Sequence, residues 1–254
     1  MLISVEELKR RFGVFPSGIL HVGAHLAEEG TEYEGAGWSP LNRIIWIESQ
    51  STLVQQLSRV LDPSKHKIIN ATVWSEAGLI KTFHVANNSQ SSSLFALGTH
   101  EQTYPEIEFD FDLSVTTSRL DEIIEDADDI SFLNMDIQGA ELEALKGLGQ
   151  KIHKVKWIYS EVNKWEVYKG CARIEDLDEY LEEHSFIRIA TRWTNGCGWG
   201  DALWIKKSER RALRKSILLF KANELSRYLT SFFQLKKHYL KSLIQSLFVR
   251  ISRR

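Results

Sequence analysis

The sequence predicts an α/β fold built on a mostly parallel β-sheet. Short apolar segments alternate with segments of helical spacing from residue 18 onward, which is the pattern of β-α-β units. The first apolar segment, residues 18–22, runs into a turn at Gly23 that leads to a predicted helix. The length of 254 residues, with 43% hydrophobic and 26% charged residues, fits one large soluble domain with an appendage.

The elements of the first third follow from their periodicity and their end signals. Ser4-Val5-Glu6-Glu7 fits a capping box, and Asp62-Pro63 ends a helix because the residue before proline disfavours helical backbone. We predict helices over 4–11, 26–36 and 51–61, and strands over 18–22, 43–48, 66–74 and 79–85. This β-α-β-α-β order favours a parallel sheet.

A long polar segment, residues 86–105, is predicted to be a loop. Loops of this length in compact domains are commonly functional. Beyond it we predict strands over 131–136, 155–161, 186–191 and 201–206, and helices from 118, over 138–147 and over 174–184. The Gly- and Trp-rich segment 193–200 joins the last two strands as a hairpin turn, so the final strand is predicted to be antiparallel.

The turn at Gly23 and the acid at the end of the second strand predict a ligand site. Glu48 lies 25 residues after Gly23, near the spacing of about 20 at which an acid bonds ribose hydroxyls in dinucleotide folds. The turn has one glycine where a dinucleotide fingerprint has three, so a pyrophosphate is poorly provided for. A ligand with ribose but no phosphate, such as S-adenosylmethionine, needs only the turn and the acid.

Polar side chains also follow other predicted strands. Asp136 ends one strand, and Glu161 and Asn163 end the next. Ligands in open α/β sheets bind outside these carboxyl ends, so we assign Asp136 to catalysis and cofactor binding and Glu161 and Asn163 to the substrate. The alternative for Asp136 is that it caps the following helix, whose first turn also holds Glu141.

Histidine supplies the expected general base, because a hydroxyl that accepts a methyl group must lose its proton. His100 lies in the long polar loop and is assigned to catalysis. His25 adjoins the Gly23-Ala24 turn and is placed with the cofactor, together with Ser92 from the serine run of the loop. The serines could instead cap a helix, and each histidine could be structural.

A second enzymatic interpretation rests on the D-x-D triplet Asp110-Phe111-Asp112. A D-x-D pair can hold a divalent metal against a sugar nucleotide, but alternation along a strand produces the same triplet. No cluster of His, Cys, Asp or Glu has zinc spacing, and no metal site is predicted.

Several segments resemble the FkbM family of S-adenosylmethionine-dependent methyltransferases. The specific block is Phe132-Leu133-Asn134-Met135-Asp136-Ile137-Gln138-Gly139-Ala140-Glu141-Leu142, with Leu145-Lys146-Gly147 behind it. The other segments are 21–25, 46–48, 86–88, 91–93, 117–121, 161–163, 168–171 and 198–202. The resemblance spans about residues 19–206.

This resemblance implies a class I methyltransferase fold, which is Rossmann-like, with seven strands and an antiparallel last strand. It also implies methyl transfer to oxygen, usually of a sugar or polyketide hydroxyl. It places Gly23, Ala24 and Glu48 at cofactor positions and Asp136 beside the cofactor. It supplies no base, so His100 and Asp136 rest on their chemistry alone.

The charge distribution divides the chain into two parts. Residues 206–254 hold 14 Lys and Arg against two acids, whereas the remainder holds 18 against 32. We therefore predict a methyltransferase domain over 1–207 and a tail over 208–254. Apolar residues recur in the tail at three- and four-residue steps, which indicates one or two basic amphipathic helices. Such helices suit an anionic membrane surface, self-association or packing on their own domain; nucleic acid is disfavoured.

These observations predict an O-methyltransferase that acts on a sugar hydroxyl of a glycan or glycolipid. Trp199, in the turn opposite the long loop, is assigned to the substrate. The alternatives are a metal-dependent glycosyltransferase using Asp110 and Asp112, or a non-catalytic scaffold that keeps the fold. Cys171 and Cys197 form no CxxC, and no apolar run suits a signal peptide or a membrane span, so the expected location is cytoplasmic, at the membrane periphery.

Overall fold

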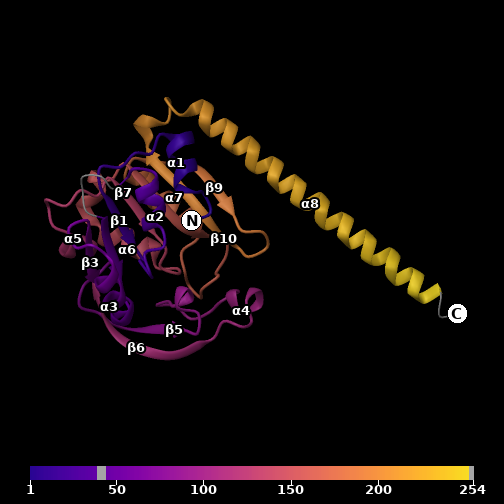
Figure 1. The fold of residues 1–254 in the computed structure, drawn as a ribbon, viewed down its shortest axis with the longest axis horizontal. Coiled ribbons are helices and arrows are strands. Elements are labelled where there is room, and N and C mark those ends of the chain that lie inside the picture. The colour runs from indigo at the N-terminus through magenta and orange to yellow at the C-terminus, as the bar shows by residue number, and fades with distance from the viewer. Residues whose placement is uncertain (39–43, 252–254) are drawn as a thin grey trace. The chain divides into compact units, whose positions relative to one another are not determined.

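The computed structural model describes residues 1–38 and 44–251. It divides into two units, residues 1–212 and residues 213–254, each described here by itself. The first unit holds the α/β fold and every site residue named above (Figure 1).

Among the described residues, seven strands form the main sheet of the first unit in the order β3-β2-β1-β7-β8-β10-β9. Their bounds are β1 Ile19–Val22, β2 Ile44–Glu48, β3 His66–Asn70, β7 Phe132–Met135, β8 Trp157–Asn163, β9 Phe186–Trp193 and β10 Trp199–Lys206. Neighbouring strands are parallel except at β10, which runs antiparallel to both β8 and β9. The predicted parallel sheet with an antiparallel last strand is therefore confirmed.

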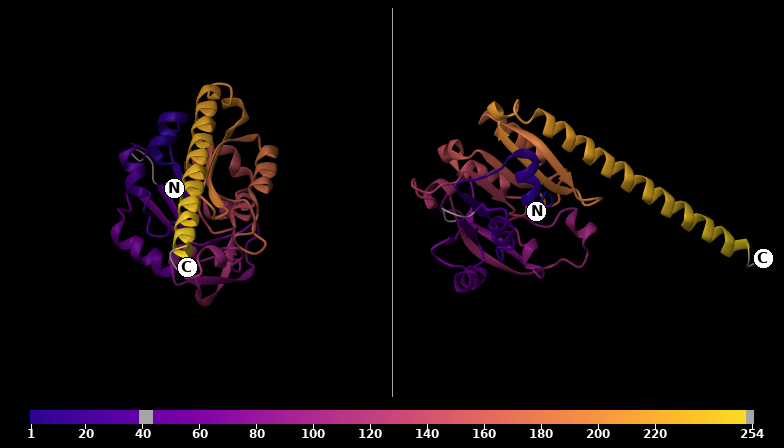
Figure 2. Two further views of the ribbon diagram at one scale, coloured as in Figure 1. Left: turned by 90° about the vertical axis from the view of Figure 1, so that its right-hand side faces the viewer. Right: turned by 45° about the horizontal axis from the view of Figure 1, so that its top comes forward.

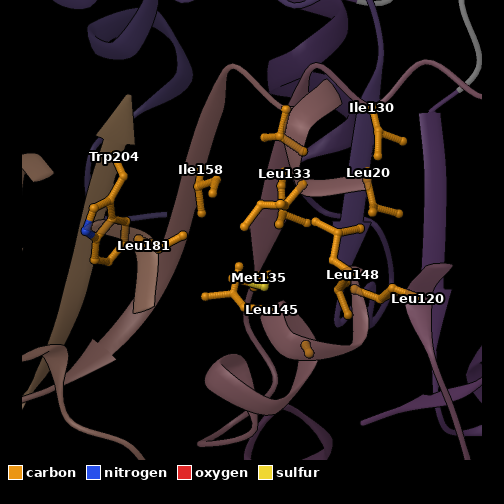
Figure 3. Packing of buried hydrophobic residues seen from close by; sticks show 14 of the residues in the cluster. Leu20, Leu120, Ile130, Leu133, Met135, Leu145, Leu148, Ile158, Leu181 and Trp204 are labelled. Carbon is orange, nitrogen blue, oxygen red and sulfur yellow. The ribbon is translucent and has the colours of Figure 1, made fainter. Parts of the chain in front are cut away.

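Helices cover both faces of this sheet. One face packs apolar strand residues such as Leu133 and Ile158 against α5 (Leu120–Ile123), α6 (Glu141–Gly147) and α7 (Ile174–Glu183), as Figure 3 shows. The opposite face is aromatic, because Tyr33 of α2 (Gly30–Gly35) stacks near Trp46 of β2 and lies edge-on to Phe132 of β7. The two layers leave the carboxyl ends of β1, β2, β7 and β8 at one edge of the sheet.

Helices α1 and α3 complete this part of the fold. In α1 (Val5–Phe12) the hydroxyl of Ser4 accepts a hydrogen bond from the backbone N–H of Glu7 at 3.3 Å, and the helix ends at Gly13 in the left-handed conformation. The predicted helix start is confirmed. Helix α3 (Ser51–Val60) follows β2 and ends before Asp62-Pro63, as predicted.

A second sheet departs from the prediction. The strand expected over 66–74 is two strands, because β3 ends at Asn70 and β4 (Thr72–Val73) pairs with β6 (Phe109–Ser118). Strand β6 was given no bounds from the sequence, although a strand was the alternative offered for Asp110-Phe111-Asp112, and it pairs antiparallel with β5 (Ile80–Ala86). Residues 109–116 alternate between apolar and polar side chains, but residues 110–114 are all exposed, so the alternation does not mark a buried face here. The helix predicted from 118 starts only at Leu120, in α5.

Two further boundaries were predicted wrongly. The helix expected over 26–36 begins only at Gly30, because His25 and Ala27 take positive φ values of 44° and 57° that interrupt a helix. The segment predicted as a polar loop, 86–105, contains a 3₁₀ turn at Ser89–Ser91 and the short helix α4 (His100–Thr103). Both pieces lie at the edge of the sheet where the strand ends meet.

The second unit contains one continuous helix, α8 (Arg214–Ile251), drawn in orange to yellow in Figures 1 and 2. Among the helix residues whose side chains the structure describes, the large apolar ones that are exposed are Leu218, Leu219, Leu225, Tyr228, Leu229 and Phe232. At 100° per residue these positions spread over about half of the helix circumference. Within the described residues no helix has both the length and the apolarity that a membrane span requires.

Candidate functional site

The turn after β1 packs directly against the turn after β7. Gly23 has φ of 90°, and a Cβ atom there would lie 1.9 Å from the backbone oxygen of Asp136. The N–H groups of Gly23 and Ala24 donate to the oxygen of Ile47, at 2.9 and 3.0 Å. This position therefore requires glycine, because any side chain would separate three neighbouring strand ends.

A cavity of about 560 Å³ opens at these strand ends. It is lined by seven of the residues that the sequence assigned to the site: Gly23, Ala24, His25, His100, Asp136, Glu161 and Trp199. They come from the β1 turn, α4, the end of β7, β8 and β10, which are far apart in the sequence. The structure thus brings most of the predicted site together around one cavity.

A second, smaller cavity of about 60 Å³ adjoins the first. Glu48 and Ser92 line it, together with Ala71, which follows β3, and both residues of β4. The two cavities share the lining residues Gly23, His25, Gln90, Asp136 and Gln138. They therefore lie next to each other at the turns after β1 and β7.

Glu48 is fixed in the smaller cavity. Its side chain is 7% exposed, and its two oxygens accept hydrogen bonds from the backbone N–H groups of His25, at 2.9 Å, and Gln50, at 2.8 Å. Burial raises the pKa of this carboxyl, against the effect of those two hydrogen bonds. Each carboxylate oxygen keeps a further lone pair, so Glu48 can also accept hydrogen bonds from a ribose diol.

The block from Asp136 to Glu141 forms a tight, strained turn. Gln138 and Gly139 have φ values of 53° and 105°. One carboxylate oxygen of Glu141 accepts from the backbone N–H groups of Ile137 and Gly139, at 3.1 Å each. Glu141 is 2% exposed and stabilises the turn through these two hydrogen bonds, a role that its place in the first turn of the helix did not predict.

Gln138 connects the acids of the cavity. Its amide nitrogen donates to Asp136 at 2.5 Å and to Glu161 at 3.3 Å, and its amide oxygen accepts from the hydroxyl of Tyr168 at 2.5 Å. The side chain of Asp136 is open to the cavity. Its position inside the cavity, which limits its contact with bulk water, and the negative charge of Asp201 raise the pKa of Asp136 to about 6. Burial raises the pKa of Glu161 well above its ordinary value.

His100 and His25 differ in whether a ring nitrogen is free to accept a proton. His100 is 7% exposed and lines the large cavity, and its Nδ1 atom is buried without a hydrogen-bond partner. Burial lowers the pKa of His100, which keeps the ring neutral near pH 7. His25 has both ring nitrogens engaged, by Glu28 at 2.6 Å and by Ser89 at 2.7 Å. His25 therefore joins the β1 turn to the 3₁₀ turn above it and is poorly placed to take a proton.

Two other predicted site residues, Asn163 and Ser92, have less direct access to a ligand. Asn163 is 1% exposed and lines neither cavity, and both polar atoms of its amide lack a partner. Ser92 accepts a hydrogen bond from the backbone N–H of Ala86 at 3.1 Å, so its hydroxyl also holds the loop in place. His21 also lines the large cavity; its Nδ1 atom lies 3.1 Å from the hydroxyl of Tyr33, and burial lowers its pKa to about 4.

Sequence reasoning missed several residues that line the large cavity. The carboxylates among them are Glu28, Glu29, Glu106 and Asp201, and Tyr104 is an aromatic one. Asp201 accepts from the hydroxyl of Tyr159 and from the backbone N–H of Leu2. Asp201 lies near the start of the last strand rather than at its end, and an antiparallel strand presents its start at this edge of the sheet. The predicted hairpin already implied that the start of this strand would face the site.

The D-x-D triplet lies outside both cavities. Asp110 and Asp112 belong to the exposed strand β6, and Asp112 pairs with His84 at 2.6 Å. Neither aspartate lines either described cavity. The strand interpretation of this triplet therefore accounts for it, and the structure gives a glycosyltransferase site no support.

Comparison with known proteins decides the family. The family model for the methyltransferase FkbM domain matches residues 21–188 of this chain. The chain belongs to the FkbM family of methyltransferases. S-Adenosylmethionine is the cofactor of these enzymes, as the sequence resemblance implied.

Two relatives illustrate the extent of the likeness. The 2-O-methyltransferase NoeI of Sinorhizobium fredii (strain NBRC 101917 / NGR234) is 34% identical over 108 residues, covering 42% of this chain and 44% of that protein. The crystal structure of methyltransferase FkbM from Methylobacillus flagellatus KT matches 80% of this chain and 47% of that one, with a TM-score of 0.50 and 15% identity. The chain spans less than half of the length of either relative, and the structural match bears on the fold alone.

Proposed function

We propose that this protein transfers a methyl group from S-adenosylmethionine to a sugar hydroxyl of a surface glycan or glycolipid. One observation carries the proposal: two adjoining cavities share Gly23 and Asp136, and Glu48 lines one of them while His100 lines the other. The smaller cavity then suits the nucleoside of the cofactor, and the larger one suits the reaction.

The residues that the two cavities share, and Glu48, fit the cofactor. Gly23 lets the turn after β1 pack against the turn after β7, and both turns line the two cavities. Glu48, in the smaller cavity, can accept hydrogen bonds from a ribose diol. The larger cavity presents Glu28, Glu29 and Asp136 to a ligand that carries a sulfonium and an ammonium group. Carboxylates around a cationic group stabilise it, so the cavity suits the methyl donor better than its uncharged thioether product.

The reaction needs one proton removed and two atoms aligned. When bound, S-adenosylmethionine supplies a methyl carbon that bonds to the hydroxyl oxygen while the carbon–sulfur electron pair returns to sulfur. His100 takes the hydroxyl proton, because its buried, neutral ring presents Nε2 as the nitrogen that can face the cavity. Asp136 and Glu161, held together by Gln138, orient the acceptor by accepting hydrogen bonds from its hydroxyls.

Two observations support oxygen and a sugar as the acceptor. The relative from Sinorhizobium fredii is named a 2-O-methyltransferase. The large cavity combines carboxylates with the aromatic rings of Tyr104 and Trp199, and sugars are polyols with apolar ring faces that such a lining suits.

Transfer of an isotope-labelled methyl group tests the proposal. The full chain is incubated with labelled S-adenosylmethionine and a panel of bacterial polysaccharides and glycolipids, and the products are hydrolysed to sugars and analysed by mass spectrometry. A labelled O-methyl sugar that His100→Gln abolishes is the expected result. Label on protein or nucleic acid, with none on any glycan, would contradict it.

We also propose that α8 attaches the enzyme to an anionic membrane surface. The helix bears the exposed apolar side chains described above, interspersed with Arg214, Lys215, Lys221 and Arg227, and it contains one acid, Glu224. Basic residues near an anionic surface contribute about 1 kcal/mol each, and exposed leucines can enter the lipid headgroup region. A lipid-linked acceptor would then be concentrated where the enzyme lies.

Vesicle sedimentation tests the attachment. The full chain should sediment with vesicles containing phosphatidylserine and should remain in solution with phosphatidylcholine alone. Exchange of Leu218, Leu225 and Leu229 for Ser should release it, whereas exchange of Phe15, an exposed apolar residue of the first unit, should not. A chain that stays soluble with both vesicles but forms dimers through α8 would replace the membrane proposal with self-association.

A further inference from the structure

We propose that the acceptor site selects sugars that carry no phosphate or carboxylate group. The sugar ring then stacks on the indole ring of Trp165. The inference rests on the proposed function and narrows its substrate class. It is carried by the charges that line the large cavity and by an exposed tryptophan beside its lining residues.

The cavity wall is rich in acids. Six acidic side chains line it, from Glu28, Glu29, Glu106, Asp136, Glu161 and Asp201. Burial raises the pKa of Glu161 and of Asp201, so the negative charge comes mainly from the other four. Of the described lining residues, none is lysine or arginine, and the N-terminal ammonium group of Met1, which also lines the cavity, lies 3.7 Å from Glu29. The four acids outnumber this ammonium group and the one net positive charge of the cofactor, so a phosphate or carboxylate on the acceptor would meet net repulsion.

The carboxylates lie where the acceptor must enter. Glu161 belongs to β8, Asp201 to β10, and Glu106 follows α4 on the side away from Glu48. His100, whose Nδ1 atom is buried and unpartnered, lines the same region. Carboxylates accept hydrogen bonds from hydroxyl groups, so this wall can bind a neutral polyol while it disfavours an anion.

Trp165 does not line the cavity itself, but it contacts residues beside the lining. Its side chain is 41% exposed, unlike the buried Trp38, Trp46 and Trp204 of the core. Its backbone oxygen accepts a hydrogen bond at 2.8 Å from Val167, which lines the cavity. A Cβ atom at Gly198 would lie 2.2 Å from the Trp165 ring, so the ring packs on the backbone that precedes Trp199. The chain thus fixes an exposed indole beside two lining residues.

The neighbouring cation does not neutralise the wall. The ammonium group of Lys164 lies 4.4 Å from the centre of the Trp193 ring, and Lys164 is not a lining residue. Tyr104 is an aromatic lining residue, and its hydroxyl donates to the sulfur of Cys197 at 3.2 Å and thereby connects α4 to the turn between β9 and β10. The lining therefore combines aromatic and acidic side chains.

Ligand-observed NMR on the full chain, saturated with S-adenosylhomocysteine, tests the selection. The probes are the methyl glycosides of common neutral hexoses, each beside its uronate and its 6-phosphate. We expect at least one neutral glycoside to bind and its two anionic counterparts to bind about tenfold more weakly or worse, which is roughly the effect of one like charge at about 10 Å.

Variants separate the two parts of the proposal. Trp165→Ala should weaken binding of the neutral glycoside about tenfold through loss of ring contact, and Phe15→Ala, at another exposed ring, should leave it unchanged. Glu106→Lys, at an exposed lining position, should reduce the discrimination against the uronate.

Three results overturn the inference. They are equal binding of neutral and anionic probes, no effect of Trp165→Ala, and no glycoside binding in a sample that calorimetry shows to hold S-adenosylhomocysteine. If calorimetry shows that S-adenosylhomocysteine binds, these results contradict only the inference about the acceptor. If S-adenosylhomocysteine does not bind, the proposed function itself is contradicted.

Discussion

Replacement of Glu141 by Gln should change how the stability of the protein depends on pH. The carboxyl of Glu141 is 2% exposed, and burial, with the nearby charge of Asp136, raises its pKa from 4.5 to about 7. A carboxyl with a raised pKa binds its proton more tightly in the folded state. It therefore stabilises the fold at low pH, and this contribution is lost as pH rises from about 4.5 through 7.

The size of the effect follows from the difference between the two pKa values. A shift from 4.5 to about 7 corresponds to about 3 kcal/mol, at about 1.4 kcal/mol for each pKa unit. Glutamine stays neutral at every pH, and its amide oxygen can accept the same two backbone hydrogen bonds from Ile137 and Gly139. The free energy of unfolding of the variant should therefore increase relative to that of the wild type as pH rises.

Urea unfolding at several pH values from 4.5 to 8 measures this difference. The free energy of unfolding of Glu141→Gln, minus that of the wild type, should grow by about 3 kcal/mol across the range and level off above pH 7. Subtraction removes the contributions of the other buried acids, which both proteins share. A difference that stays constant with pH would refute the reasoning, and Glu179→Gln, at an exposed acid of α7, should give that constant difference.

Two further substitutions test the site. Gly23→Ala should lower the melting temperature and abolish binding of S-adenosylhomocysteine, because its Cβ would overlap the oxygen of Asp136; Gly37→Ala, with φ of 75° but open space around it, should lose only about 1–2 kcal/mol of stability and keep its binding. His100→Gln should reduce kcat about 10²–10⁴-fold with S-adenosylhomocysteine affinity unchanged, and the acidic limb of the wild-type rate profile should lie below the ordinary imidazole pKa of 6.5.

The main sheet was predictable because its strands are apolar runs bounded by turn residues. The strand ends also predicted Gly23, Glu48 and Asp136, since parallel strands meet at one edge. The pairing of β5 with β6 was not predicted, although residues 109–116 alternate between apolar and polar side chains as a strand does. The alternation was used only to explain Asp110 and Asp112, and it does not say which strand is the partner.

The acidic residues that line the cavity could not be predicted from the sequence either. Glu28, Glu29 and Glu106 lie in turns and loops, where charged residues are ordinary, and their convergence depends on tertiary structure. Conversely, His25 was singled out on chemistry, but its two ring nitrogens are engaged by Glu28 and Ser89. Residue type predicts what a side chain can do, whereas the hydrogen bonds of the fold decide which one is available.

Calorimetric titration of the full chain with S-adenosylhomocysteine tests the central claim most directly, with Glu48→Ala as the variant and Glu179→Ala as the control at an exposed position. The account predicts one binding site in the wild type and the control. It predicts a loss of about 2–4 kcal/mol in Glu48→Ala, from two charged hydrogen bonds to ribose, or about 30- to 1000-fold in Kd. A folded wild type that binds nothing, or a folded Glu48→Ala variant that binds as well as the wild type, would contradict the account.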